Sequence, residues 1–105
     1  MLTEQQRQIV KRARDRIAEP AHWCQGTFAR TADGFECLCT DPRVQRFCAF
    51  GVLVAECAAQ DGWNASANAS VLAILLAPRG LAAINDGPDG YRKVLALFDK
   101  ALAEA

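Results

Sequence analysis

The sequence predicts a mainly α-helical protein, a small bundle of about four helices around one buried central helix. Hydrophobic residues make up 51% of the chain, and in the first and last segments they recur every three or four positions, as on one face of a helix. The most apolar continuous run, RFCAFGVLVAECAA, occupies residues 46–59 in the middle of the chain. Proline and glycine separate the runs. A short irregular or β-hairpin segment is expected at 21–40.

The first helix is expected from Thr3 to Glu19. Thr3 and Gln6 have the spacing of a capping box, in which each side chain bonds the backbone N–H of the other residue. Apolar residues then follow at helical spacing, with charged residues on the opposite side. Pro20 ends the helix because its ring cannot continue the hydrogen-bond ladder. This pattern predicts an amphipathic helix that packs by one face.

Residues 21–40 lack the helical period. Gly26 and Gly34 interrupt them, and apolar and polar residues alternate weakly on both sides of Asp33-Gly34. Such alternation around an Asp-Gly turn is typical of a β-hairpin. Because an isolated two-stranded ribbon is marginally stable, we expect this one to lie against the helices.

The central helix is predicted over residues 41–60. Asp41 is a suitable N-cap and Pro42 fits the first helical position. The following run is apolar on nearly every side, which predicts burial against several neighbours. Gly51 costs stability within a helix, so we expect it at a close helix–helix crossing.

Two more helices are expected in the C-terminal part. Residues 71–77 are apolar throughout, which predicts a helix buried on all sides. Residues 85–90, Asn-Asp-Gly-Pro-Asp-Gly, have the composition of a loop. Asp89 is then expected to cap a final amphipathic helix from Tyr91 to Glu104.

Length and composition exclude several classes of protein. A chain of 105 residues is expected to form a single domain, 1–105. Twelve basic and twelve acidic residues give zero net charge, so we expect no nucleic-acid partner. No apolar stretch reaches the roughly 20 residues of a membrane span, so no membrane partner is expected. Five cysteines without a secretory leader favour reduced thiols in the cytoplasm. No cofactor motif stands out, and no cofactor is expected.

Polar and aromatic residues outside the predicted helices form a candidate ligand site. They come from the segments 21–40 and 85–90: Trp23, Arg30, Asp33, Asn85 and Asp86. Asn and Asp beside glycine also bond nearby backbone in ordinary turns, which is the alternative interpretation. The sequence favours a non-catalytic interaction or small-ligand-binding module over an enzyme.

A cysteine-dependent hydrolase or transferase is the first alternative. Cys48 would be the nucleophile, His22 the general base, and Asn85 or Asp86 the group that orients the base. Cys48 lies in the middle of an apolar face, however, where burial raises a thiol pKa and hides the sulfur. A packed core cysteine is therefore the favoured interpretation of this position.

A zinc-stabilised domain is the second alternative. A hairpin would bring two ligand pairs together: His22 with Cys24, and Cys37 with Cys39. Zinc takes four nitrogen or sulfur ligands in a tetrahedron, but the familiar ligand pairs have two residues between the cysteines, and here only one intervenes. Unliganded thiols are therefore the simpler expectation, with no metal.

Together these residues resemble a family of short, uncharacterised bacterial and phage proteins that share a domain of unknown function. The family pattern has a Trp and a Gly after an amphipathic helix, an Asp-Gly turn, an aromatic-Cys-Ala-x-Gly-Ala-Leu helix, and an Asn-Asp pair before the last helix. The matching positions span almost the whole chain: Trp23, Gly26, Asp33-Gly34, Phe47–Leu53, Asn85-Asp86, Val94 and Ala101.

The chain departs from that pattern in two ways. Phe47 and Val52 stand where the pattern has Trp and Ala, and both are packing replacements. His22 and every cysteine except Cys48 lie outside the pattern, which counts against the catalytic triad and the zinc site. No activity is known for the family, so the resemblance implies a fold and draws attention to the Trp and the Asn-Asp pair.

Two nearly all-apolar helices are a large surface to bury in a chain of this length. That surface belongs either to a large core or to an interface with another chain. The sequence therefore also predicts a protein partner, of which a second copy of the chain is the simplest.

Overall fold

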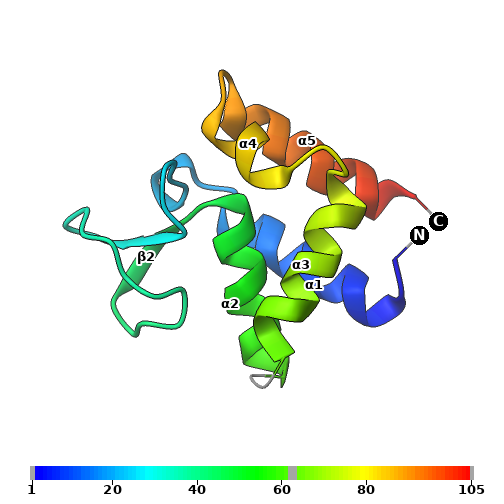
Figure 1. Cartoon of the computed structure of the whole chain (residues 1–105), viewed down its shortest axis with the longest axis horizontal. Coiled ribbons are helices and arrows are strands. Elements are labelled where there is room, and N and C mark those ends of the chain that lie inside the picture. The colour runs from blue at the N-terminus through cyan, green and yellow to red at the C-terminus, as the bar shows by residue number, and fades with distance from the viewer. Residues whose placement is uncertain (1, 62–63, 105) are drawn as a thin grey trace.

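The computed structural model describes residues 2–61 and 64–104. The elements in order are α1 (Glu4–Arg16), the 3-10 turn η1 (Pro20–His22), β1 (Ala29–Thr31), β2 (Val44–Phe47), α2 (Ala49–Asp61), α3 (Ala65–Leu76), α4 (Leu81–Asp86) and α5 (Gly90–Ala103). The helices group together, and the β segment projects from one side of them (Figure 1). The prediction of a mainly α protein with a short hairpin is confirmed.

The core forms between α1, α2, α3 and α5, with α2 packed on α1 and α3, and α5 packed on α1. Its largest fully buried apolar side chains come from all four helices and from the residue after α1: Val10, Ile17, Val52, Leu53, Leu72, Val94 and Phe98. Burying one such side chain contributes about 1.5–3 kcal/mol. The apolar stripes predicted for the first and last helices therefore face this core.

Ion pairs connect α1 to α2 and α5. Arg16 Nε lies 2.7 Å from Glu56 Oε2 of α2, and Arg14 Nε lies 2.7 Å from Asp99 Oδ1 of α5. Glu56 is buried, so its charge needs a partner, and the Arg16 guanidinium supplies it.

The first helix begins as predicted and ends earlier. The capping box is present: Thr3 Oγ1 accepts from the Gln6 N–H at 3.1 Å, and Gln6 Oε1 accepts from the Thr3 N–H at 2.9 Å. The helix ends at Arg16 and not at Glu19. The Tyr91 hydroxyl of α5 donates to the Ile17 carbonyl oxygen at 2.8 Å, so a distant residue satisfies one of the carbonyls left unpaired at the end of α1.

The predicted start of the central helix is wrong. That helix, α2, begins at Ala49, and the residues before it form strand β2. Asp41 does accept a nearby N–H, but from Arg43 at 2.8 Å, which makes a turn and not a helix cap. The reason is tertiary: the backbone of 44–47 bonds β1, a partner that lies far away in sequence.

Strand β1 has a neighbour on each side. It pairs antiparallel with β2, with Ala29 opposite Phe47 and Thr31 opposite Val44. On its other edge the Thr31 N–H donates to the Phe35 carbonyl at 2.9 Å. The turn predicted at Asp33-Gly34 lies between these last two residues, and Gly34 has φ +89°, which a glycine adopts without strain.

The close approach at Gly51 is to a loop and not to another helix. A Cβ atom at this position would lie 2.0 Å from the carbonyl oxygen of Phe28. The same carbonyl accepts the Cys48 N–H at 3.1 Å. Gly51 thus allows the segment before β1 to lie directly on the first turns of α2.

Helix α3 is not buried on all sides, contrary to prediction. It packs on α2 through the four residues of one face: Ala65, Ala69, Leu72 and Leu76. On its other side Val71, Ile74 and Leu75 are 49%, 64% and 46% exposed. These three residues are called the α3 ridge below. The sequence could not show that no other described element covers this face.

The predicted loop 85–90 is shorter than expected. Asn85 and Asp86 form the last turn of α4, and α5 begins at Gly90. Asp89 holds the N-cap position of α5 with φ 58°, but its side chain bonds no N–H of that helix and instead lies 3.5 Å from Arg92. None of the described helices has the length and the apolar composition that crossing a membrane requires.

Candidate functional site

The side chain of Asn85 is the best-connected polar group among the described residues. It is fully buried at the end of α4. Its Oδ1 accepts from Trp23 Nε1 at 2.7 Å and from the Ala49 N–H at 2.9 Å. Its Nδ2 donates to the Cys24 carbonyl at 3.1 Å and to Asp86 Oδ1 at 3.0 Å. Both the acceptor and the two donors of the carboxamide are therefore in use.

These bonds join α4 to α2 and to the segment 23–24. The Ala49 N–H is one of the unpaired donors at the start of α2, so Asn85 caps that helix from outside. Trp23 also packs on Tyr91 of α5, with ring centroids 5.3 Å apart. A fully satisfied buried network is rigid and specifies one arrangement. We call Asn85 and its bonded partners the Asn85 centre.

Asp86 fastens the segment after Trp23. Its Oδ1 accepts from the Gly26 N–H at 3.0 Å, and Gln25 Nε2 donates to the Asn85 carbonyl at 3.1 Å. Beside these contacts is a cavity of about 280 Å³. Its lining combines one carboxylate, one thiol and apolar surface: Gly26, Thr27, Phe28, Cys48, Ala82 and Asp86.

The structure brings together three of the five predicted ligand residues. Trp23, Asn85 and Asp86 meet in the Asn85 centre, and of these only Asp86 lines the cavity. Arg30 lies on β1, where its guanidinium donates to the Gly34 carbonyl at 2.9 Å. Asp33 is exposed in the turn that follows β1. The sequence grouped these residues by composition, whereas the fold separates the hairpin pair from the others.

The three groups proposed for cysteine catalysis do not assemble. Cys48 is buried beside the cavity, and burial raises the pKa of its thiol. The Gly51 N–H donates to its sulfur at 3.2 Å. His22 is exposed on η1, and its side chain bonds no residue that the structure describes. The donors and the acceptor of the Asn85 side chain are already hydrogen-bonded, so Asn85 is not available to orient a histidine. The site therefore offers a neutral thiol without a base.

The four residues considered for zinc do not converge either. Within residues 2–61 and 64–104, no three His, Cys, Asp or Glu side chains lie close enough to hold a metal ion. Burial raises the pKa of the Cys24 and Cys39 thiols to about 11. His22 and Cys37 lie on separate segments, η1 and the strand-like stretch after β1.

Comparison with known proteins identifies a family. The model of a family of unknown function, DUF6197, matches residues 1–104. The chain belongs to this family. No curated protein and no solved structure matches it. The family-level resemblance expected from the sequence is thus confirmed, and the family carries no assigned activity that could be transferred.

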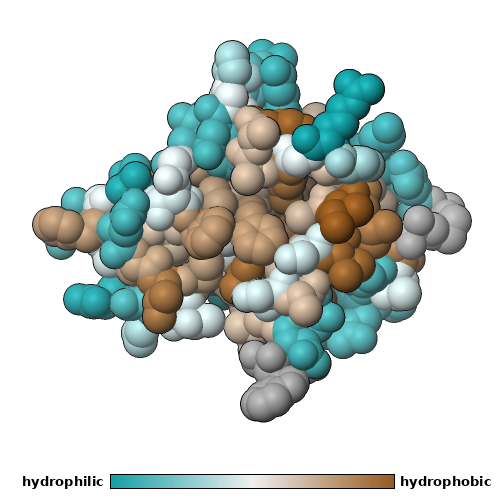
Figure 2. Space-filling model, in the orientation of Figure 1, coloured by the Kyte–Doolittle hydropathy of each residue, from teal (hydrophilic) through white to brown (hydrophobic). Residues whose placement is uncertain are grey.

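The feature that sequence reasoning missed in this DUF6197 member is its exposed apolar surface. Hydrophobic surface gathers across the middle of one face and over α3 (Figure 2). The α3 ridge supplies part of it, and exposed Phe28, tilted against Phe50 with centroids 5.5 Å apart, lies on another element. One signal was present in the sequence: α3 carries no charged residue at all, on any side.

Proposed function

We propose that this protein is a non-catalytic interaction module that pairs with a second copy of itself through the α3 ridge. The observation that carries the proposal is the exposure of Val71, Ile74 and Leu75 on one face of one helix. Large apolar residues at spacings of three and four form a continuous strip along a helix. Contiguous exposed apolar surface is typical of a protein interface.

The absence of charge supports a second copy as the partner. In a two-fold symmetric dimer each surface patch meets itself, so a charged patch would meet like charge. Residues 65–76 contain no Asp, Glu, Lys or Arg. The exposed residues next to the ridge, Ala67 and Ser70, are small, which allows two helices to approach closely. The α3 surface is therefore compatible with a copy of itself.

The other functions considered have less support. A cysteine enzyme needs an activated thiolate, and Cys48 is a buried thiol without a base. All five cysteines are free, which supports a reducing, cytoplasmic setting for the module. Binding of a small molecule is compatible with self-association and is taken up separately below.

Sedimentation velocity over a wide range of protein concentration tests the proposal. The wild-type protein should shift from monomer to dimer as concentration rises. Ile74→Lys should remain monomeric, because an ammonium group would have to be buried in the middle of the interface. Ile74 is 64% exposed in the monomer, so the substitution should leave folding intact.

Leu38→Lys is the matched control. Leu38 is 75% exposed but lies in the loop before β2, away from α3, so this variant should dimerise as the wild type does. A wild-type protein that stays monomeric at every concentration would contradict the proposal. Equal loss of dimer in both variants would show that general surface hydrophobicity, and not the α3 ridge, drives association.

A further inference from the structure

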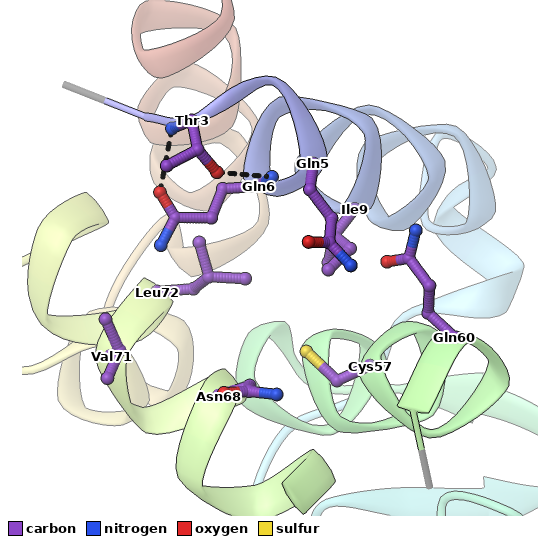
Figure 3. Close-up of a pocket in the computed structure, with 9 residues that line it drawn as sticks. All are labelled: Thr3, Gln5, Gln6, Ile9, Cys57, Gln60, Asn68, Val71 and Leu72. Carbon is purple, nitrogen blue, oxygen red and sulfur yellow. Dashed lines mark hydrogen bonds between the residues drawn. The ribbon is translucent and has the colours of Figure 1, made fainter.

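A second cavity lies at the other end of α2, distant in sequence from the Asn85 centre. It has a volume of about 250 Å³ and lies between the first turns of α1, the last turns of α2 and the first half of α3 (Figure 3). Its floor is apolar and consists of Ile9, Cys57 and Leu72, which are all buried. We call it the carboxamide pocket.

Three carboxamides from three helices surround this floor. Gln5 belongs to α1, Gln60 to α2 and Asn68 to α3. In Figure 3, Gln5 and Gln60 extend toward one another across the opening, and the Cys57 sulfur points into the space below them. None of the three carboxamides has a hydrogen bond to any described residue. Each therefore offers an N–H donor and an oxygen acceptor to whatever enters.

The neighbouring Gln6, in contrast, is a carboxamide that is hydrogen-bonded within the fold. Its oxygen accepts from the Thr3 N–H at 2.9 Å in the capping box, so this side chain holds the start of α1 (Figure 3). Gln5 stands one residue earlier and serves no such purpose. Thr3 and Gln6 also line the pocket, so the capping box forms one part of its wall, whereas Gln5, Gln60 and Asn68 take no part in the bonds that hold the start of α1.

The lining carries no formal charge. Among the residues that the structure describes around it there is no Lys, Arg, Asp, Glu or His, and burial raises the pKa of the Cys57 thiol, which favours its neutral form. An ionised ligand would lose hydration here and gain no opposite charge in return. The pocket is therefore suited to a neutral molecule that carries both donors and acceptors.

We propose that the carboxamide pocket binds a neutral nucleobase or a base-like planar heterocycle. A carboxamide presents N–H and C=O side by side, the arrangement with which Asn and Gln pair to the edge of adenine. The apolar floor would receive the face of the ring. The volume lies just below the roughly 300–1,000 Å³ of typical ligand pockets, which suits a ring without an attached sugar phosphate.

The test is a titration with free adenine and free cytosine, followed by two-dimensional NMR of the side-chain NH₂ groups. The signals of Gln5, Gln60 and Asn68 should shift along a saturable curve. Benzoate, a planar ring of similar size with a negative charge, should cause no saturable shift. Equal binding of benzoate, or shifts confined to other parts of the protein, would overturn the proposal.

A matched pair of variants on one helix sharpens the test. Gln5→Leu removes one rim group and should weaken adenine binding about tenfold, the loss expected for one or two hydrogen bonds. Gln8→Leu makes the same change at an exposed α1 position outside the pocket and should leave the affinity unchanged. If both variants bind adenine like the wild type, the carboxamides do not recognise the base.

The pocket shares one lining residue, Val71, with the α3 ridge. Ile74 does not line the pocket, so the Ile74→Lys variant should bind adenine with the wild-type affinity even if it no longer dimerises. Loss of binding in that variant would mean that the site requires the second copy, which would contradict a pocket complete within one chain.

Discussion

The Asn85 centre and the carboxamide pocket use the same chemical group for opposite purposes. Asn85 is fully buried and makes four hydrogen bonds, to Trp23 and Cys24 of the segment after η1, to Ala49 of α2 and to Asp86 of its own helix. Gln5, Gln60 and Asn68 are exposed and make none to the described chain. A carboxamide stabilises the structure when its hydrogen bonds are made within the fold. A carboxamide whose hydrogen bonds are made only to water is available to a ligand.

The two regions also differ in what water can do. Around Asn85, water cannot replace a lost partner, so each broken bond leaves a buried polar atom without a partner, at a cost of about 1–3 kcal/mol. At the pocket rim, water already bonds the free carboxamides, so their loss should scarcely affect stability. Three predictions follow the comparison from the largest effect to the smallest.

Replacing Asn85 should have the largest effect on stability. Asn85→Leu keeps the volume but leaves the Trp23 N–H, the Ala49 N–H and the Cys24 carbonyl unpaired, so we expect a loss of about 3 kcal/mol or more. Urea unfolding followed by far-UV circular dichroism measures it. Asn68→Leu makes the same replacement at the pocket rim and should change stability by less than about 0.5 kcal/mol. Similar losses in both variants would refute the comparison.

Removing a single partner of Asn85 should have an intermediate effect. Trp23→Phe keeps an aromatic ring near Tyr91 but removes the indole N–H that lies 2.7 Å from Asn85 Oδ1. We expect a loss of about 2 kcal/mol, since one bond of a buried network is broken and ring volume is lost. The same urea experiment reports it. Equal stability of Trp23→Phe and wild type would show that the Ala49 N–H alone satisfies Asn85.

The smallest effect should appear at alkaline pH. Burial raises the pKa of the Cys24 thiol from 9.0 to about 11, so above pH 9 the unfolded chain releases a proton that the folded chain still holds. Stability from this group is complete below pH 9 and falls as pH rises to 11, by at most about 2 kcal/mol and by less to the extent that water screens the thiolate. Unfolding curves at pH 8 and 11 should differ less in Cys24→Ala. Cys39 has a similarly raised pKa, so part of the decrease in stability with rising pH should remain in that variant.

Local patterns predicted much of the fold. The capping box at Thr3 and Gln6, the turn at Gly34 and the apolar stripes of α1 and α5 are present, because each depends on residues only a few positions apart. The prediction that α2 begins at Asp41 was wrong, because residues 41–48 are not helical. Asp41-Pro42 is a suitable local start for a helix. The backbone of Val44–Phe47 instead pairs with β1, a strand distant in the sequence.

Helices α2 and α3 show the limit most clearly. Both sequences are apolar nearly all round, and the sequence predicted both to be buried. Helix α2 is covered by α1, α3 and the segment before β1, whereas among residues 2–61 and 64–104 no element covers the exposed face of α3. The composition of a helix indicates how much apolar surface it carries. Which helix buries that surface depends on how the neighbouring elements pack.

The sequence by itself determined the helical class, the family and the turn at Asp33-Gly34. It also marked Trp23 and the Asn-Asp pair, although it assigned them to a ligand and not to a structural centre. Only the tertiary structure decided which polar groups found partners: it filled every bond of Asn85, and it left three carboxamides from three helices open around one apolar floor. The physical reason is that hydrogen-bond satisfaction depends on atoms brought together from distant parts of the chain.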